Sequence, residues 1–133
     1  MATAGNKQMR SVLIVDDEFL IRYSLQKIME SEGYSTITAE SGHEALRIVT
    51  AGKPDIVILD INLPDANGMV LLRTIKKDHP SAVVILATGC PEEEYGNEAI
   101  RMGAIAYLEK PVNIDQLIGT MQSLEHGEPR MTA

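Results

Sequence analysis

Acidic, hydroxyl and amine side chains follow some of the most apolar stretches of this sequence. Asp16 and Asp17 come directly after one apolar run, and Asp60 ends another. Thr88 and Lys110 follow two later runs in the same way. Clustered carboxylates repel one another unless a cation neutralises them. If these residues meet, they predict a hard divalent metal site, with Mg²⁺ as the natural ion, beside a carboxylate able to accept a phosphoryl group.

The elements expected to position these residues alternate along the chain. Apolar runs predict strands at residues 11–15, 56–60, 82–87 and 105–109, and an alternating pattern predicts another at residues 35–39. Apolar residues at helical spacing predict helices at residues 19–33, 41–52, 69–79, 91–102 and 113–125. This alternation is typical of an α/β protein with a doubly wound parallel sheet, here five-stranded and covered on both faces. The carboxyl ends of parallel strands share one edge, and there the site should form.

Side-chain signals mark where three of these helices should begin. Ser41 and Glu44 have the Ser-x-x-Glu spacing of a capping box. Asn113 is placed to cap the last helix. Pro91 suits the first position of the fourth helix, because its missing N–H is not needed there.

Composition and charge narrow the classes of function. The 133 residues, 44% hydrophobic and 23% charged, suit one soluble globular domain. No apolar run approaches the roughly 18 residues of a membrane span, so no membrane contact is expected. The formal net charge of −7 argues against direct binding of nucleic acid. Cys90 is the single cysteine, so no internal disulfide can form, and a reducing cytoplasm fits best.

The domain is expected to span residues 11–125. Residues 1–10 lack the apolar segment of a secretory signal and are predicted to be a disordered N-terminal tail. Residues 126–133 are predicted to be a C-terminal tail or linker.

Each candidate residue also has a simpler interpretation. Asp16 or Asp17 could cap the helix that follows, and Asp60 could be a turn residue at the end of a strand. Thr88 could be an ordinary loop hydroxyl, and Lys110 a solvated surface charge. The convergence of all of them on one edge of a parallel sheet favours the metal site over these alternatives.

Four motifs occur in the order VDDE, LDINLPDANG, ATG and YLEKP. With them, the sequence resembles the receiver domains of response regulators in two-component signalling over residues 11–125. The segment ATGCPEEEYGNEAIRMGAIAYLEKP is most similar in character to receivers of sigma-54-dependent, NtrC-type transcriptional regulators. The resemblance implies a CheY-like, flavodoxin-like fold with strand order 2-1-3-4-5.

The resemblance implies a role for each residue of the metal site. Asp60 is the expected phosphoacceptor. Asp17 is the expected principal ligand of Mg²⁺, with Mn²⁺ as an alternative, and Asp16 assists directly or through water. Asn62 is expected to offer its backbone carbonyl to the same ion.

A conformational switch is also implied by the resemblance. Thr88 is expected to turn inward and hydrogen-bond the new phosphoryl group, and Lys110 to pair with one of its oxygens. Tyr107 is expected to follow Thr88 from an exposed to a buried rotamer, and the Lys110–Pro111 bond to be cis. The competing interpretation of Tyr107 is a strand residue whose hydroxyl stays in water.

The implied function is that of a phosphorylated switch. A cognate histidine kinase supplies the phosphoryl group, and the domain catalyses only its own phosphorylation and dephosphorylation. The face of the fourth helix, last strand and last helix is expected to form a homodimer or to contact an output domain or effector, and through it to control transcription. A stand-alone phosphorelay intermediate is the alternative.

Two other classes of function fit the residues less well. A haloacid-dehalogenase-like phosphatase needs a second carboxylate two residues after its nucleophile, where this chain has Asn62. A cofactor-binding flavodoxin-like module is disfavoured because no G-x-G-x-x-G or P-loop pattern is present.

Overall fold

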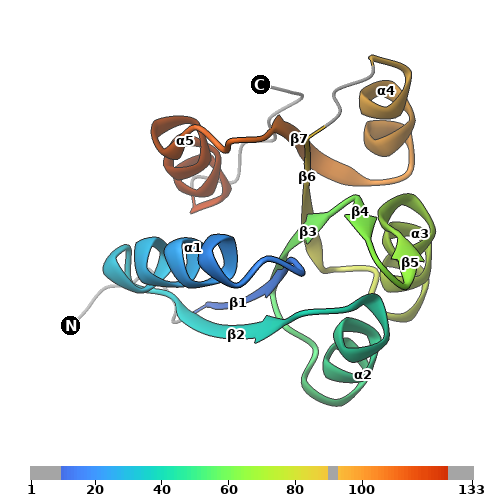
Figure 1. Ribbon diagram of the computed structural model, residues 1–133, viewed down its shortest axis with the longest axis horizontal. Helices are drawn as coiled ribbons and strands as arrows, with labels where there is room; N and C mark the ends of the chain where they lie inside the picture. The colour runs from blue at the N-terminus through green and yellow to red at the C-terminus, as the bar shows by residue number, and fades with distance from the viewer. Residues whose placement is uncertain (1–9, 90–92, 126–133) are drawn as a thin grey trace.

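A central parallel sheet carries the helices on its two faces (Figure 1). The computed structural model describes residues 10–89 and 93–125. The five strands take the order β2-β1-β3-β6-β7, with the bounds β1 (Ser11–Val15), β2 (Ser35–Ala39), β3 (Ile56–Asp60), β6 (Val83–Thr88) and β7 (Ala104–Glu109). Every neighbouring pair is parallel. The predicted fold class and strand order are confirmed, because β6 and β7 are the fourth and fifth strands of the sheet.

Within the described residues, five helices cover the sheet in two layers. Figure 1 places α1 and α5 on one face and the other three on the opposite face. The helices are α1 (Phe19–Ser31), α2 (Gly42–Gly52), α3 (Gly68–Asp78), α4 (Glu93–Arg101) and α5 (Ile114–Glu125). No helix in these described ranges is both long and apolar enough to cross a membrane.

The core follows from strands that are apolar on both sides. Along β1, Leu13 and Val15 join the cluster beneath α2, α3 and α4, whereas Val12 and Ile14 join the one beneath α1 and α5. All five residues of β3 are buried. Burying one such side chain stabilises the fold by about 1.5–3 kcal/mol. The sheet is therefore a rigid platform, and its loops carry the polar residues.

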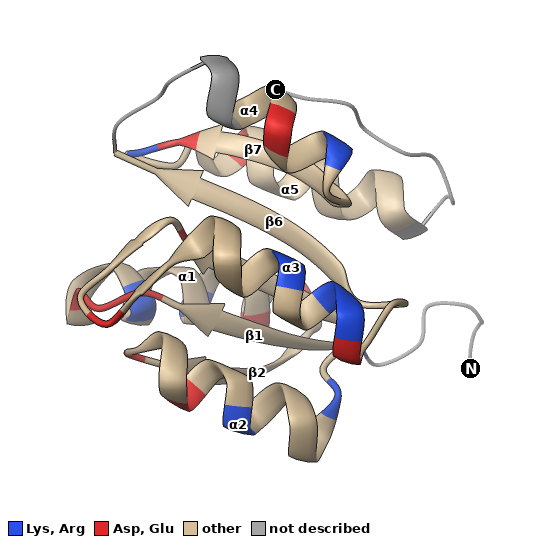
Figure 2. Cartoon of the chain, turned by 90° about the vertical axis from the view of Figure 1, so that its right-hand side faces the viewer, with Lys and Arg blue, Asp and Glu red and all other residues tan. Residues whose placement is uncertain are grey.

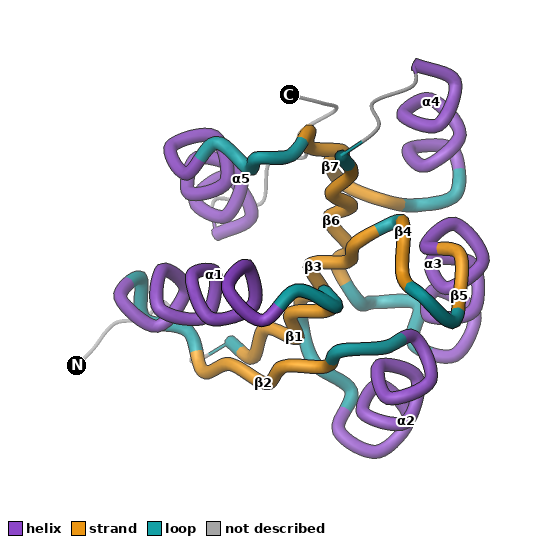
Figure 3. The backbone as a smooth tube through the Cα atoms, viewed as in Figure 1, coloured by secondary structure: helices purple, strands orange, loops and turns teal. Residues whose placement is uncertain are grey.

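A small hairpin lies between β3 and α3, where the sequence predicted only a loop (Figure 3). Its strands are β4 (Asn62–Leu63) and β5 (Ala66–Asn67), paired antiparallel. Pro64 and Asp65 form the turn, for which proline is suited by its fixed φ. Strands of two residues have no hydrophobic period of their own, so the sequence does not reveal them.

Two of the predicted helix starts are confirmed, one with a difference. The Ser41 hydroxyl accepts the Glu44 N–H at 3.1 Å, as in a capping box. The Glu44 carboxylate, however, accepts the N–H of Glu40 at 3.0 Å rather than that of Ser41. The Asn113 side chain accepts the Gln116 N–H at 2.9 Å at the start of α5.

Several predictions fall on residues outside the described ranges. The predicted helix start at Pro91 and the lone Cys90 both belong to this group. So do the predicted tails, residues 1–10 and 126–133, except for Arg10. These remain predictions.

Candidate functional site

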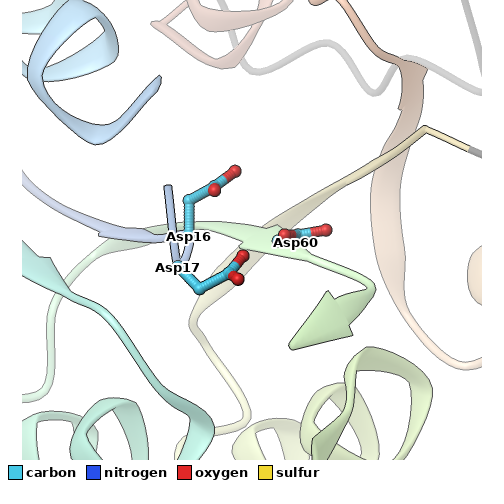
Figure 4. A group of neighbouring side chains, drawn as sticks. All are labelled: Asp16, Asp17 and Asp60. Carbon is cyan, nitrogen blue, oxygen red and sulfur yellow. The ribbon is translucent and has the colours of Figure 1, made fainter. Parts of the chain in front are cut away.

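Three carboxylates meet at the carboxyl ends of β1 and β3. These two strands are neighbours in the sheet, and Val15 lies opposite Leu59. Asp16 and Asp17 leave β1, Asp60 ends β3, and one oxygen of each lies within 4.8 Å of the other two (Figure 4). Figure 2 shows β1 and β6 pointing to the same end of the molecule, where the sequence predicted that the site should form.

Lys110 reaches this cluster from the end of β7. Its ammonium lies 2.7 Å from Asp16 Oδ2 and 3.2 Å from Asp60 Oδ2, and its side chain is 15% exposed. The interpretation of Lys110 as a solvated surface charge is therefore wrong. The Lys110 N–H also donates to the Thr88 carbonyl at 2.7 Å, and the Lys110–Pro111 bond is cis, as expected.

The pKa values of Lys110 and Asp60 are both raised, which favours the charged form of Lys110 and the neutral form of Asp60. Burial lowers the pKa of Lys110, but the hydrogen bond to Asp16 and the charges of Asp60 and Asp16 outweigh it, so the pKa is raised. For Asp60, burial instead raises the pKa, and the Asn62 N–H and the Lys110 charge only partly oppose this effect. Lys110 therefore stays an ammonium, and an added cation would favour the ionised form of Asp60.

Replacing Asp60 by asparagine should stabilise the metal-free protein. The raised pKa means that ionised Asp60 costs folding free energy above its folded-state pKa, and that this cost vanishes below the unfolded-state pKa. Lys110 keeps Asp16 as a partner in the variant. We expect a gain on the order of 1 kcal/mol at neutral pH, which shrinks as the solution is acidified. Urea unfolding with a chelator present, at neutral and acidic pH, measures both; a loss of stability at neutral pH would contradict the electrostatic account.

Several contacts fix Asp16, which is 2% exposed. Besides the Lys110 ammonium, its Oδ1 accepts the Glu18 N–H at 2.9 Å. Arg22 donates to its backbone carbonyl at 2.8 Å. The N-cap of α1 is Glu18, so the interpretation of Asp16 or Asp17 as the cap is wrong. Arg22 was not identified from the sequence as a contact of Asp16. The only signal for this contact was the position of Arg22, one turn into the helix that follows Asp16.

Thr88 and Asp60 end adjacent strands. Thr88 follows Ala87, which lies opposite Asp60, and Thr88 is 1% exposed, so it is not an ordinary loop hydroxyl. Tyr107 lies on β7 with its hydroxyl oxygen buried, unlike the interpretation that left it in water. Its ring lies against Gly96 of α4, where an added β-carbon would be 3.2 Å from Tyr107 Cδ2.

Asn62 and the rest of the hairpin face Asp17 across an open pocket of about 460 Å³. Asn62 is exposed, and its N–H donates to Asp60 Oδ1 at 3.0 Å. Gly68 closes the hairpin against the strand end, because a β-carbon there would lie 2.5 Å from Ile61 Cα. The pocket gives a ligand direct access to the carboxylate of Asp17.

The donor set suits a hard divalent cation. The site offers the carboxylate oxygens of Asp16, Asp17 and Asp60, all from one edge of the sheet. Oxygen-only ligands with an open side are typical of Mg²⁺, which keeps several of its waters. The Lys110 ammonium offsets only part of the negative charge of the cluster.

Comparison with known proteins agrees with this geometry. Residues 12–122 match the sequence model of the response regulator receiver domain. The chain belongs to this family. It is similar to the receiver domain protein (CheY-like) from Methanospirillum hungatei, with a TM-score of 0.85 and 32% identity over 90% of this chain and 96% of that chain.

Two curated relatives differ in how much of their length this receiver covers. It is 38% identical to the DNA-binding transcriptional regulator NtrC of Klebsiella pneumoniae over 79% of this chain, but spans only 22% of that protein. It is 37% identical to the sporulation initiation phosphotransferase F of Bacillus subtilis over 80% of this chain and 86% of that protein.

Proposed function

We propose that this receiver accepts a phosphoryl group on Asp60 from the phosphohistidine of a cognate histidine kinase, in a reaction that requires Mg²⁺. The observation that carries the proposal is a buried carboxylate held 3.2 Å from a lysine ammonium inside a cluster of two further carboxylates. Toward other substrates the domain is not an enzyme. We place the reaction in the cytoplasm, where such a kinase has ATP.

The chemistry is an in-line displacement at phosphorus. An Asp60 oxygen forms the new P–O bond as the P–N bond to the kinase histidine breaks, and the bond pair stays on that nitrogen. Asp17, Asp16, Asp60 and the Asn62 carbonyl would hold Mg²⁺, which neutralises charge on the phosphoryl oxygens when bound. Lys110, already beside Asp60, pairs with another of these oxygens. Hydrolysis of the acyl phosphate by water returns Asp60 to its free state.

The conformational switch follows from the negative charge that phosphorylation adds at Asp60. A phosphoryl group adds negative charge and strong acceptors, which draw the Thr88 hydroxyl inward. Tyr107 lies against Gly96 of α4, which supports a coupling between this side chain and the helix. Its hydroxyl oxygen is already buried in the unphosphorylated protein, so the expected movement does not begin from a fully exposed rotamer here. A two-state response needs a free-energy gap of only a few kcal/mol.

Output passes through the face of α4, β7 and α5, which we propose forms a homodimer or contacts an output domain or effector. Control of transcription is favoured by the similarity to NtrC, of which this chain spans 22%. The alternative is a phosphorelay intermediate, favoured by the similarity to the phosphotransferase of B. subtilis, of which it spans 86%. The formal net charge of −7 argues against direct contact of this domain with nucleic acid.

Substitution of Leu20 should separate the kinase reaction from the intrinsic chemistry. Phe19 and Leu20 begin α1, two and three residues beyond Asp17, and are 64% and 74% exposed. A kinase that reaches Asp60 must also contact the start of α1. We expect Leu20→Ser to slow transfer from the cognate kinase by roughly tenfold, the scale of one lost leucine contact. Phosphorylation by a small acyl phosphate should not change.

The matched control is Ile37→Ser, on the edge strand β2, where the side chain is 41% exposed. Its rates with both donors should equal those of the parent. Equal rates of transfer from the kinase to Leu20→Ser and to the parent would show that the start of α1 is not part of the surface that docks the kinase.

The proposed function is tested by incubation with a radiolabelled small acyl phosphate and Mg²⁺. One phosphoryl group per chain should be incorporated, in a bond that hydroxylamine cleaves as it does other acyl phosphates. A chelator should prevent incorporation. No incorporation, or a product stable to hydroxylamine, would refute the proposal.

A further inference from the structure

Asp65 joins the hairpin beside the site to helix α2. Its two carboxylate oxygens accept the N–H groups of Gly42 at 2.8 Å and His43 at 3.0 Å. These are the first residues of α2, whose N-cap Ser41 accepts the N–H of Glu44 instead. The first N–H groups of a helix have no acceptor within it. Asp65 therefore supplies acceptors from a segment more than twenty residues away.

The charge of Asp65 suits this position. A carboxylate near a helix N-terminus is favoured by the helix dipole and by charge-assisted hydrogen bonds. The N–H groups of Gly42 and His43 accordingly hold the pKa of Asp65 below its usual range. Asp65 is exposed, so burial does not hold its carboxylate in place, whereas the Gly42 and His43 N–H groups do.

The hairpin that Asp65 holds forms one wall of the site. β4 begins at Asn62, whose N–H donates to Asp60 Oδ1, and Asn62 lies opposite Asn67 on β5. The pocket of about 460 Å³ separates this hairpin from Asp17. The position of the hairpin therefore sets the distance between the Asn62 backbone and the carboxylates.

Gly42 makes a second contact between α2 and the hairpin. A β-carbon at this residue would lie 2.8 Å from the Ala66 β-carbon and 3.0 Å from Leu71 Cδ1. Real β-carbons almost never approach so closely, so a larger residue would push the two segments apart. This contact offers a way to move the hairpin without changing any charge.

We propose that Asp65 is a positioning residue of the metal site: by tying the hairpin turn to the start of α2, it fixes where the Asn62 backbone carbonyl meets Mg²⁺. The inference rests on the proposed function and adds a coupling to it. Because linkage is reciprocal, Mg²⁺ bound at the site strengthens the contact between Asp65 and α2 to the same extent.

The test compares Mg²⁺ dissociation constants, measured by NMR titration of backbone amides. Asp65→Ala should raise the dissociation constant about fivefold, less than the ~10–100-fold typical of residues that touch a ligand directly, because Asp65 lies three positions after Asn62 and acts only through the hairpin. Asp65→Asn, which keeps one acceptor, should be intermediate. Asp78→Ala, at the end of α3, removes the same charge and should match the parent.

Three further measurements separate an effect of hairpin position from an effect of charge. Gly42→Ala leaves all charges in place and should also weaken Mg²⁺ binding. The difference between Asp65→Ala and the parent should persist in high salt, which screens exposed charges. In the parent, Mg²⁺ should slow hydrogen exchange of the Gly42 and His43 amides, and it should not do so in Asp65→Ala.

The outcomes distinguish the inference from the proposed function. If the parent binds Mg²⁺ and both Asp65→Ala and Gly42→Ala bind it equally well, the positioning role is refuted and the proposed function stands. The same conclusion follows if the effect of Asp65→Ala disappears in high salt. A parent that does not bind Mg²⁺ overturns both.

Discussion

Asp60→Asn should incorporate no phosphoryl group from either a histidine kinase or a small acyl phosphate. Asparagine occupies the same volume but has no carboxylate oxygen with which to form the acyl phosphate. We expect a fall in rate of at least ~1,000-fold, the scale on which loss of a nucleophile acts. Autoradiography after incubation with a labelled donor and Mg²⁺ gives the measurement.

The control for this variant must remove an aspartate without touching the site. Asp78→Asn does so at the end of α3, where the side chain is exposed. It should be labelled as fast as the parent. If Asp60→Asn were labelled at the same rate as Asp78→Asn, another residue would be the acceptor. The expected stability gain of Asp60→Asn makes unfolding an unsuitable explanation for lost labelling.

Asp17→Asn should remove most of the affinity for Mg²⁺. Asp16 is already bound to Lys110 and to the Glu18 N–H, whereas Asp17 is exposed and faces the pocket. Asp17 therefore has the carboxylate best placed to approach an ion. We expect the dissociation constant to rise at least tenfold, at the lower end of the effects of removing groups around a metal. Calorimetric titration with MgCl₂ measures the change.

The free energy of unfolding without metal separates a lost ligand from a damaged fold. Because Asp17 is exposed and its replacement leaves no partner unpaired among the described residues, Asp17→Asn should change this free energy of unfolding by less than ~0.5 kcal/mol. Asp16→Asn offers the contrast, because it weakens the 2.7 Å pair with Lys110 and should lower stability. Unchanged Mg²⁺ affinity in Asp17→Asn would place the ion elsewhere.

The sequence predicted the parts of the fold that depend on long apolar runs. Strands such as Ile56–Asp60, buried along their whole length, leave a continuous apolar signal. Once five strands alternate with helices, their carboxyl ends must share an edge, so the sequence alone could place Asp16, Asp60 and Lys110 at the same edge.

The parts that could not be predicted depend on contacts between distant segments. The two-residue strands of the hairpin are fixed by packing rather than by propensity. The Asp65 contact joins residues 22 and 23 positions apart, and neither end has a local pattern that names the other. The sequence placed Lys110 at the right edge but gave no reason to pair it more closely with Asp16 than with Asp60.

Binding of beryllofluoride, which mimics a phosphoryl group on a carboxylate, tests the central claim most directly. We predict one saturable ¹⁹F NMR signal per chain that requires Mg²⁺, with amide shifts centred on Asp60, Thr88 and Lys110. The signal should be absent in Asp60→Asn and present in the control variant Asp78→Asn. A signal that persists in Asp60→Asn, or that forms equally well without Mg²⁺, would contradict a metal-dependent acceptor at Asp60.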